Sequence, residues 1–285
     1  MDYASTFCIC FSGITLRFVF PSPVALPDEF AGLLCADTGS PDAEYTVKLL
    51  TTPLRPAEPP VSSECGIKIY QTHEGWLRIY SALSAADGCQ VACFLCPNGK
   101  NTLYYPASKW EFYSSPLHCA HLLGGENLLL WHDAFLLHSS VVQINGKSVL
   151  FSGPSCAGKS TQAALWHRYL GAEILNGDRC VVMKKADGFY GGGSLWCGTS
   201  GIYRREQSPI AGIFLVHKAP ENRVVRLGFD AFAPLFSQTI VNSWDPDFMA
   251  KVSSLYAELL SQVPVYRLDC RPDKGAVQVA YDTLF

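Results

Sequence analysis

The sequence predicts an α/β protein in two parts, and three observations support this prediction. Short apolar runs separated by turn signals fill residues 1–109, a pattern typical of β-strands. Residues 148–170 show a strand, a glycine-rich turn and a helix in succession. Further strands and late helices follow to residue 285. We therefore expect a smaller β-rich module over residues 1–125 and an α/β domain with a mixed sheet over residues 126–285.

The amino-terminal module is predicted as an antiparallel sheet. Turn signals at residues 12–13, 73–75 and 97–99 indicate that several strands form hairpins. Four prolines within residues 53–63 indicate an exposed loop rather than a domain linker. The module shows no catalytic cluster, and we expect it to recognise an acceptor or to form an oligomer contact. The expected strands are residues 6–11, 14–20, 44–50, 67–71, 77–82, 90–95 and 102–105.

A hairpin is predicted near the start of the α/β domain. Residues 135–144 form an apolar run, which Asn145 and Gly146 separate from the next one. Asn-Gly is a strong hairpin signal because both residues of a type I′ turn need positive φ. Counting outward from this turn places His138 opposite Gly153. A lone histidine in an apolar strand is usually a core residue, but this register brings it to a glycine-rich loop and favours a functional role.

The glycine-rich motif G-x-x-x-x-G-K-S begins at Gly153 and ends at Ser160. Because a β-rich stretch precedes it and a helical pattern follows it, the motif predicts a nucleotide-binding phosphate loop, or P-loop. Backbone N–H groups would attract the phosphates, Lys159 would reach the β- and γ-phosphates, and Ser160 would ligate Mg²⁺. The expected nucleotide-binding residues are Gly153, Pro154, Ser155, Cys156, Ala157, Gly158, Lys159, Ser160 and Thr161.

A carboxylate for the same site is expected after the next strand. Residues 172–176 follow the helix, and a right-handed crossover would make this strand run parallel to the one before the loop. Asp178 comes just past its carboxyl end, where α/β sheets build their sites. Asp178 would ligate Mg²⁺ together with Ser160, accept a proton from an acceptor hydroxyl, or do both. The alternative is a turn residue without chemistry, since Asn-Gly-Asp is a common turn composition.

The rest of the domain is predicted from turn and capping signals. Asp245 followed by Pro246 is a typical helix start, with a side-chain cap and a residue that needs no N–H partner. Two strands before it, residues 210–217 and 224–227, are expected to pair with each other. The full set is a hairpin that turns at residues 186–188, the strands 210–217, 224–227 and 265–268, and the helices 230–240, 246–263 and 273–284.

Several stretches resemble the catalytic domain of HPr kinase/phosphorylase, and more closely the HPr-kinase-like proteins often found near peptide-modification genes. They are Leu-His-Ser-Ser-Val-Val with its Asn-Gly turn, Phe-Ser-Gly-Pro-Ser-x-Ala-Gly-Lys-Ser-Thr, and Leu-Asn-Gly-Asp-Arg. The resemblance covers about residues 130–285. It implies a carboxykinase-like P-loop domain that transfers the γ-phosphoryl group of ATP, with Mg²⁺, to a hydroxyl group. A serine of a protein or peptide is the first candidate acceptor.

The resemblance also implies roles for single residues. Family members carry a histidine on the strand before the P-loop, which matches His138, and an acidic pair on the following strand. The implied catalytic residues are His138, Asp178 and Lys159. The chain departs from the family twice. Cys156 replaces a common glycine, which a negative φ would tolerate, and the acidic pair is reduced to Gly177-Asp178. Two alternatives stay open: a kinase of a small molecule such as free serine, and a non-catalytic ATP-binding sensor or scaffold.

The composition limits the class of protein. Of the 285 residues, 48% are hydrophobic, enough for a large core, and the net charge is −3 at pH 7. The chain has no basic surplus for nucleic acid and no apolar run of membrane-spanning length. The apolar stretch over residues 7–20 contains Arg17 and follows no basic segment, so we expect no signal peptide.

The twelve cysteines are scattered along the chain. Cys93 and Cys96 have the spacing of half a metal site, and His118 and Cys119 are candidates for the other half. Strand alternation over residues 90–95 and the lack of a second C-x-x-C argue against zinc. We expect buried free thiols in a reducing cytoplasm. The expected partner is a protein or peptide acceptor, a homo-oligomer is compatible with the sequence, and neither nucleic acid nor membrane is expected.

Overall fold

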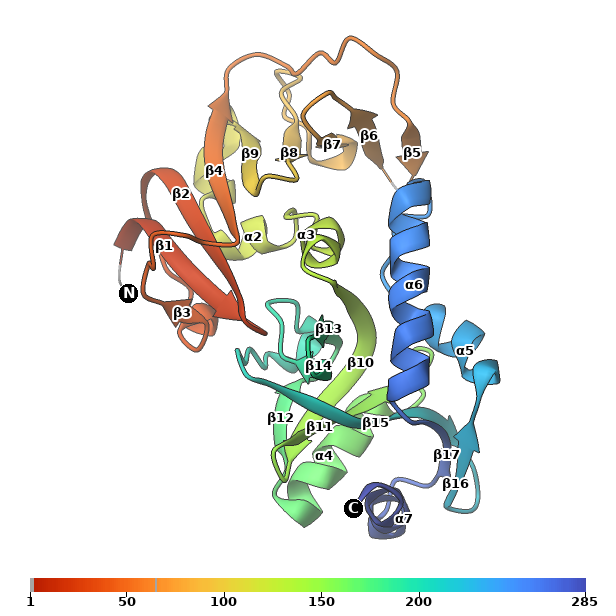
Figure 1. Cartoon of the computed structure of the whole chain (residues 1–285). Coiled ribbons are helices and arrows are strands. Elements are labelled where there is room, and N and C mark those ends of the chain that lie inside the picture. Colours follow the sequence, from red (N-terminus) through yellow and green to blue (C-terminus); the bar gives the residue numbers. More distant parts are fainter. Residues whose placement is uncertain (1–2, 65) are drawn as a thin grey trace. The chain divides into compact units, whose positions relative to one another are not determined.

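The computed structural model describes residues 3–64 and 66–285 (Figure 1). Its contacts divide the chain into two compact units. Unit 1 comprises Met1–Cys10 and Ile14–Leu128, and unit 2 comprises Phe11–Gly13 and Leu129–Phe285. The described strands form two mixed sheets, and helices accompany both, so the protein belongs to the α/β class.

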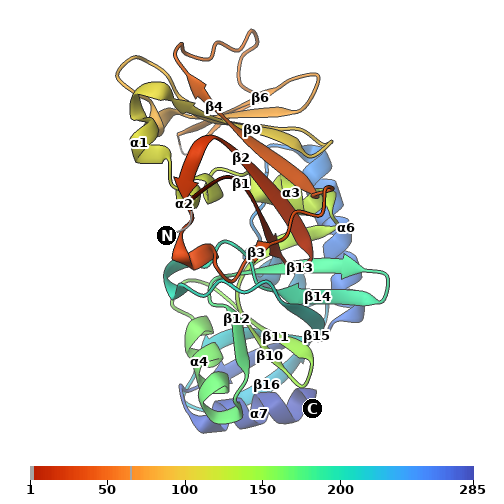
Figure 2. The same ribbon diagram turned by 90° about the vertical axis from the view of Figure 1, so that its left-hand side faces the viewer.

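Unit 1 is built on nine strands in the order β3-β1-β2-β4-β9-β8-β7-β6-β5. β4 pairs in parallel with both β2 and β9 (Figure 2), so the prediction of an antiparallel sheet is wrong at its centre. The chain forms β5 to β8 between β4 and β9, and such a long connection allows a parallel pair. The strands are β1 Tyr3–Phe11, β2 Ile14–Ala25, β3 Leu34–Cys35, β4 Ala43–Leu50, β5 Ser62–Glu64, β6 Ile67–Gln71, β7 Trp76–Tyr80, β8 Val91–Leu95 and β9 Lys100–Pro106.

Aromatic side chains pack one face of this sheet. Alternation along β2 buries Phe18, whose ring stacks on Phe7 and Tyr45 at centroid distances of 5.3 and 5.7 Å. The Tyr45 hydroxyl donates a hydrogen bond to the Leu123 carbonyl at 2.9 Å, which satisfies the polar end of a buried ring. The helices of this region are η1 Asp28–Phe30, η2 Ser81–Leu83, η3 Ala107–Lys109, α1 Trp110–Tyr113, α2 Pro116–Ala120 and α3 Gly125–Trp131.

The sheet of unit 2 has the order β11-β10-β13-β14-β15-β17-β16, and β12 pairs with β10 outside this path. β11 pairs with β10 in antiparallel fashion and with β15 in parallel. β12 is also antiparallel to β10 and therefore runs in the direction of β11, as predicted. The strands are β10 Ala134–Ile144, β11 Lys147–Ser152, β12 Glu173–Asn176, β13 Arg179–Lys185, β14 Gly188–Gly192, β15 Gln207–Lys218, β16 Arg223–Leu227 and β17 Val265–Cys270.

Two hydrophobic cores cover this sheet. Val141 packs in a core with α6, whereas its neighbour Val142 packs in a core with α4 and α7. Adjacent strand residues point to opposite faces, so the continuous apolar run of β10 fills both cores. The helices are α4 Lys159–Leu170, α5 Phe232–Phe236, α6 Pro246–Gln262 and α7 Lys274–Leu284, with short turns η4 Gly198–Ser200 and η5 Phe229–Ala231.

Local predictions for unit 2 are mostly confirmed, and one long-range prediction is wrong. Ile144 pairs with Lys147, as the Asn-Gly turn predicts, and Asp245 caps α6 by accepting from two backbone N–H groups. The strands β15 and β16, however, do not pair with each other. β17 lies between them, parallel to β15 and antiparallel to β16. This insertion buries Val265 and Leu268 of β17. Burial of these side chains stabilises the observed strand order more than the closeness of β15 and β16 along the chain favours their direct pairing.

Candidate functional site

The glycine loop, residues 153–158, connects β11 to the first turn of α4. Gly153 and Gly158 have φ angles of 143° and 111°, which strongly favour glycine. A Cβ atom at Gly153 would lie 3.2 Å from the Ala157 Cβ and 3.3 Å from the Val216 carbonyl oxygen. Residues 154–156 are exposed, and α4 presents open N–H groups and the positive end of its dipole here. The loop therefore provides a place for an anion.

Cys156 adopts a conformation that the sequence does not predict. Its φ is +62°, in the left-handed region, so the condition under which cysteine would replace glycine without strain, a negative φ, is not met. The position keeps a backbone conformation that favours glycine. An L-residue in this region costs about 1–2 kcal/mol. Of the cysteines that the structure describes, Cys156 is the exposed one.

Replacing Cys156 by glycine is expected to stabilise unit 2. Relief of the left-handed strain outweighs the extra chain entropy of glycine by about 0.5–1 kcal/mol, which raises the melting temperature by about 2 °C. The measurement is thermal unfolding followed by circular dichroism. Cys156→Ala is the matched control, because it removes the thiol and keeps the Cβ atom. A gain of equal size in both variants would mean that the thiol, and not the backbone, is responsible.

Lys159 is buried against the loop that precedes it. Its Nζ donates hydrogen bonds to the carbonyl oxygens of Gly153 at 2.9 Å and Pro154 at 3.1 Å. Burial lowers the pKa of the Lys159 ammonium below its ordinary value, and the carboxylate of Asp178 opposes this shift. The ammonium group is thus held inside the loop and within electrostatic reach of Asp178.

His138 and Asp178 lie side by side near the glycine loop. His138 Nε2 is 3.3 Å from Asp178 Oδ1, and both side chains are about one-third exposed, at 35% and 31%. The Ser152 hydroxyl, one residue before the loop, donates to the His138 carbonyl at 3.0 Å and ties β10 to the loop. Burial lowers the pKa of His138, the charge of Lys159 lowers it further, and Asp178 opposes both.

The turn that carries Asp178 is held by a buried asparagine that sequence reasoning missed. Asn176 Oδ1 accepts from the backbone N–H groups of Asp178 at 2.8 Å and Arg179 at 2.9 Å. Its Nδ2 donates to Ser194 Oγ at 3.2 Å and to the Trp196 carbonyl at 3.3 Å. The signal in the sequence was the turn composition Asn-Gly-Asp, in which asparagine commonly bonds the backbone two residues on.

Gly198 is a second residue that the prediction did not assign to the site. Its φ is +57°, and a Cβ atom there would lie 2.7 Å from Asp178 Cγ. The absence of a side chain therefore lets this segment lie directly against the Asp178 carboxylate. In the sequence, only the general resemblance over about residues 130–285 covered this position, and it gave Gly198 no role.

The space beside Gly177, the position at which the resemblance would imply a second acid, is filled from the same segment. A Cβ atom at Gly177 would lie 2.5 Å from Ser200 Cβ, closer than two carbon atoms approach without displacement. A carboxylate at this position would require Ser200 to move. The reduction of the acidic pair to Asp178 is therefore matched by the packing around it.

The structure thus brings together three of the predicted residues, His138, Asp178 and Lys159, within unit 2. Ser160 and Thr161 are exposed on the first turn of α4, directly after Lys159. The other predicted nucleotide-binding residues form the glycine loop. Their roles stay predictions.

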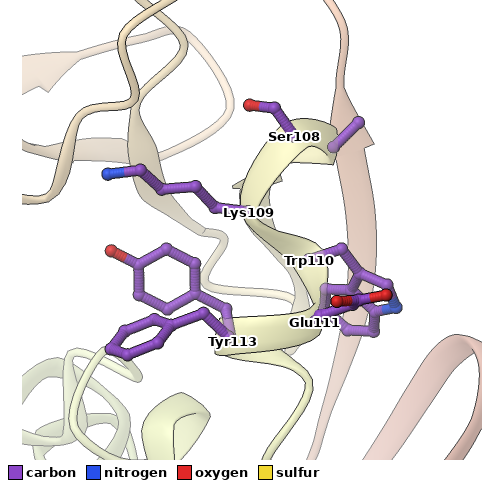
Figure 3. Close-up of a pocket in the computed structure, with 7 residues that line it drawn as sticks. Ser108, Lys109, Trp110, Glu111 and Tyr113 are labelled. Atoms are coloured by element: carbon purple, nitrogen blue, oxygen red, sulfur yellow. The ribbon is translucent and has the colours of Figure 1, made fainter.

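Two further places carry no comparable chemistry. Within residues 3–64 and 66–285, no group of three or more His, Cys, Asp or Glu side chains is placed to hold a metal ion. Cys93 and Cys96 therefore belong to no such group among these residues. A hollow of about 860 Å³ lies along η3 and α1 in unit 1 (Figure 3). Lys109 and Glu111 extend to opposite sides of this short segment, and Lys109 Nζ donates to the Ser84 carbonyl at 3.1 Å.

Comparison with known proteins finds a likeness in structure and none in sequence. No family model matches the chain, and no curated protein matches it. Among solved structures, the chain is similar to the HPr(Ser) kinase/phosphatase from Coxiella burnetii, at 13% sequence identity. The match covers 52% of this chain and 87% of that chain, with a TM-score of 0.30. At this score the likeness carries no argument about fold or function.

Within the part of the chain that the structure describes, no helix combines the length and the apolar character that a transmembrane crossing requires.

Proposed function

We propose that this chain is an ATP-dependent phosphotransferase that moves the γ-phosphoryl group of ATP to a hydroxyl group. The observation that supports it is the His138–Asp178 pair, 3.3 Å apart, beside a glycine loop that carries Lys159. An anion-binding loop alone suits many ligands, whereas transfer to a hydroxyl also needs a nearby proton acceptor. A serine of a protein or peptide is the acceptor we favour, and we infer a carboxykinase-like P-loop fold for unit 2 and a cytoplasmic location.

In this proposal the glycine loop and the first turn of α4 bind the phosphates of ATP. The backbone N–H groups of the loop and the dipole of α4 favour the negative charge. Lys159 exchanges the carbonyl oxygens of Gly153 and Pro154 for β- and γ-phosphate oxygens, which are stronger acceptors for an ammonium group. Gly153 and Gly158 keep the backbone close enough for these contacts.

The donor set fits a Mg²⁺ ion that the nucleotide itself largely coordinates. Mg²⁺ in such sites takes one or two protein ligands, and phosphate oxygens and water supply the others. Ser160 offers a hydroxyl group on the exposed first turn of α4, and Asp178 offers the carboxylate. When bound, Mg²⁺ neutralises negative charge on the transferring phosphates.

In the transfer step, the His138–Asp178 pair accepts the proton of the acceptor hydroxyl group. The acceptor oxygen forms a bond to the γ-phosphorus, and the bond from that phosphorus to the bridging oxygen of ADP breaks. The hydroxyl proton passes to the pair, while Lys159 neutralises charge on the phosphates. With glycine at position 177, one carboxylate and one imidazole serve both metal binding and proton transfer.

The test is transfer of label from γ-labelled ATP, in the presence of Mg²⁺, to serine-containing proteins and peptides and to free serine. We expect label on a protein or peptide serine. Label on free serine alone would favour a small-molecule kinase of the same fold. MgATP binding without transfer to any acceptor would contradict the proposal and support a non-catalytic ATP-binding sensor. The packing of Ser200 against Gly177, which would have to shift to admit a second acid, is the observation that favours this second candidate.

A further inference from the structure

A cavity of about 360 Å³ opens beside the glycine loop within unit 2. It is bounded by the first half of α4, the end of β15 and the segment that follows β17. Its volume lies within the range of about 300–1,000 Å³ for small-molecule sites. Ala157 and Gly158 belong both to the glycine loop and to the wall of this cavity. A ligand in the cavity therefore lies next to an anion on the loop.

Gln162 places a buried polar group in the wall of this cavity. Its side chain lines the cavity and is 2% exposed. Its Nε2 donates to Cys270 Sγ at 3.2 Å, but its Oε1 has no hydrogen-bond partner among the described residues. In this orientation the open end is a carbonyl oxygen, which accepts hydrogen bonds and calls for a donor. A buried amide group without a partner costs about 1–3 kcal/mol, so such groups call for an explanation.

The remaining lining combines aliphatic surface, which suits a flat apolar ring, with the polar side chains of Thr161, Lys218 and Arg271, which are exposed to solvent. Val216 and Ala157 present aliphatic surface, and Pro272 closes the cavity on the side of the segment after β17. Nucleotide-sized ligands combine an apolar base, polar groups on its edge and a charged phosphate chain. The cavity, the open Gln162 oxygen and the glycine loop match these three parts in order.

We infer that this cavity holds the base of the bound nucleotide and that Gln162 selects bases with an exocyclic amino group, such as adenine. The amino N–H donates to Gln162 Oε1 and satisfies the buried oxygen. The inference rests on the proposed function, because it places the base of the same nucleotide whose phosphates bind the glycine loop. Gln162 is thereby a specificity-determining residue that no part of the phosphate motif identifies.

The decisive experiment compares three probes on the wild-type protein by calorimetry with Mg²⁺. They are ATP, purine riboside triphosphate, which lacks the amino group, and inorganic tripolyphosphate, which lacks the nucleoside. We expect ATP to bind about tenfold more tightly than purine riboside triphosphate, because a site built for a hydrogen bond rejects an analogue that cannot make it. Tripolyphosphate should bind more weakly than either nucleotide.

The variant Gln162→Leu should abolish this preference without affecting the phosphate site. In this variant ATP and purine riboside triphosphate should bind equally, and the affinity for tripolyphosphate should match that of the wild type. Gln278→Leu, on the exposed face of α7, is the matched control and should keep the tenfold preference. The wild-type comparison decides even if Gln162→Leu fails to fold.

The outcomes separate this inference from the proposed function. Equal affinity of the wild type for the two nucleotides would overturn the role of Gln162 and leave nucleotide binding intact. A preference that persists in Gln162→Leu would overturn it as well. If the wild type binds none of the three probes, both the proposed function and this inference are wrong.

Discussion

Replacing Asp178 by asparagine is expected to lower the rate of phosphoryl transfer by about 10²–10⁴-fold, the typical contribution of a positioned acid or base. Asparagine keeps the shape that packs against Gly198 but removes the negative charge that ligates Mg²⁺ or accepts the proton. Affinity for MgATP should change by less than about tenfold, because most of it comes from the glycine loop and Lys159. The measurements are single-turnover transfer from labelled ATP and calorimetric binding.

Asp187→Asn is the matched control for this variant. Asp187 is also an aspartate in a turn of unit 2, between β13 and β14, and the Tyr190 hydroxyl donates to it at 2.8 Å. An asparagine can accept the same bond, so this variant should retain full transfer. If Asp178→Asn is equally active, Asp178 is a turn residue without chemistry and is removed from the mechanism.

Substitution of His138, the partner of Asp178, tests directly whether the two residues act as a pair. His138→Gln should reduce transfer because it removes the imidazole 3.3 Å from Asp178 Oδ1. Groups that act as a unit are not additive, so the double variant should be no slower than the slower single variant. Rate losses that multiply would mean that His138 and Asp178 act independently, and the pair would have to be abandoned as the proton acceptor.

Lys159→Ala is expected to weaken MgATP binding by about 10–100-fold, since a charge-assisted hydrogen bond contributes about 1.5–3 kcal/mol. The change removes the cation that neutralises the phosphates, together with its bonds to Gly153 and Pro154. The fold should persist, because removal of these bonds is offset by removal of a buried charge. Calorimetry measures the affinity, and thermal unfolding verifies the fold.

Lys147→Ala provides the matched control for the lysine variant. Lys147 is exposed at the opposite end of β11, next to the Asn-Gly turn, and should contribute nothing to nucleotide affinity. Unchanged MgATP binding in a folded Lys159→Ala protein would contradict the proposed phosphate site. Complete loss of binding in both lysine variants would point to a general effect of charge rather than to the loop.

Local features of unit 2 were predictable because they depend on residues close together in the chain. The Asn-Gly turn sets the pairing of Ile144 with Lys147 through its own backbone geometry. The cap of α6 at Asp245 and the left-handed Gly171 that ends α4 follow from single side chains and from glycine's freedom at positive φ. The neighbourhood of His138 and the glycine loop follows from the same hairpin register.

Only the tertiary structure decided which distant segments meet. β17 lies between β15 and β16, and β4 lies between β2 and β9. Burial of apolar side chains stabilises these pairings, and no local sequence pattern encodes them. The positive φ of Cys156, the approach of Gly198 to Asp178 and the open Gln162 oxygen all depend on such contacts. By itself the sequence determined the α/β class, the glycine loop and the residues at its mouth. Packing between segments far apart in the chain determined the sheet order, the surroundings of the carboxylate and the cavity beside the loop, since their energies come from surfaces that exist only after folding.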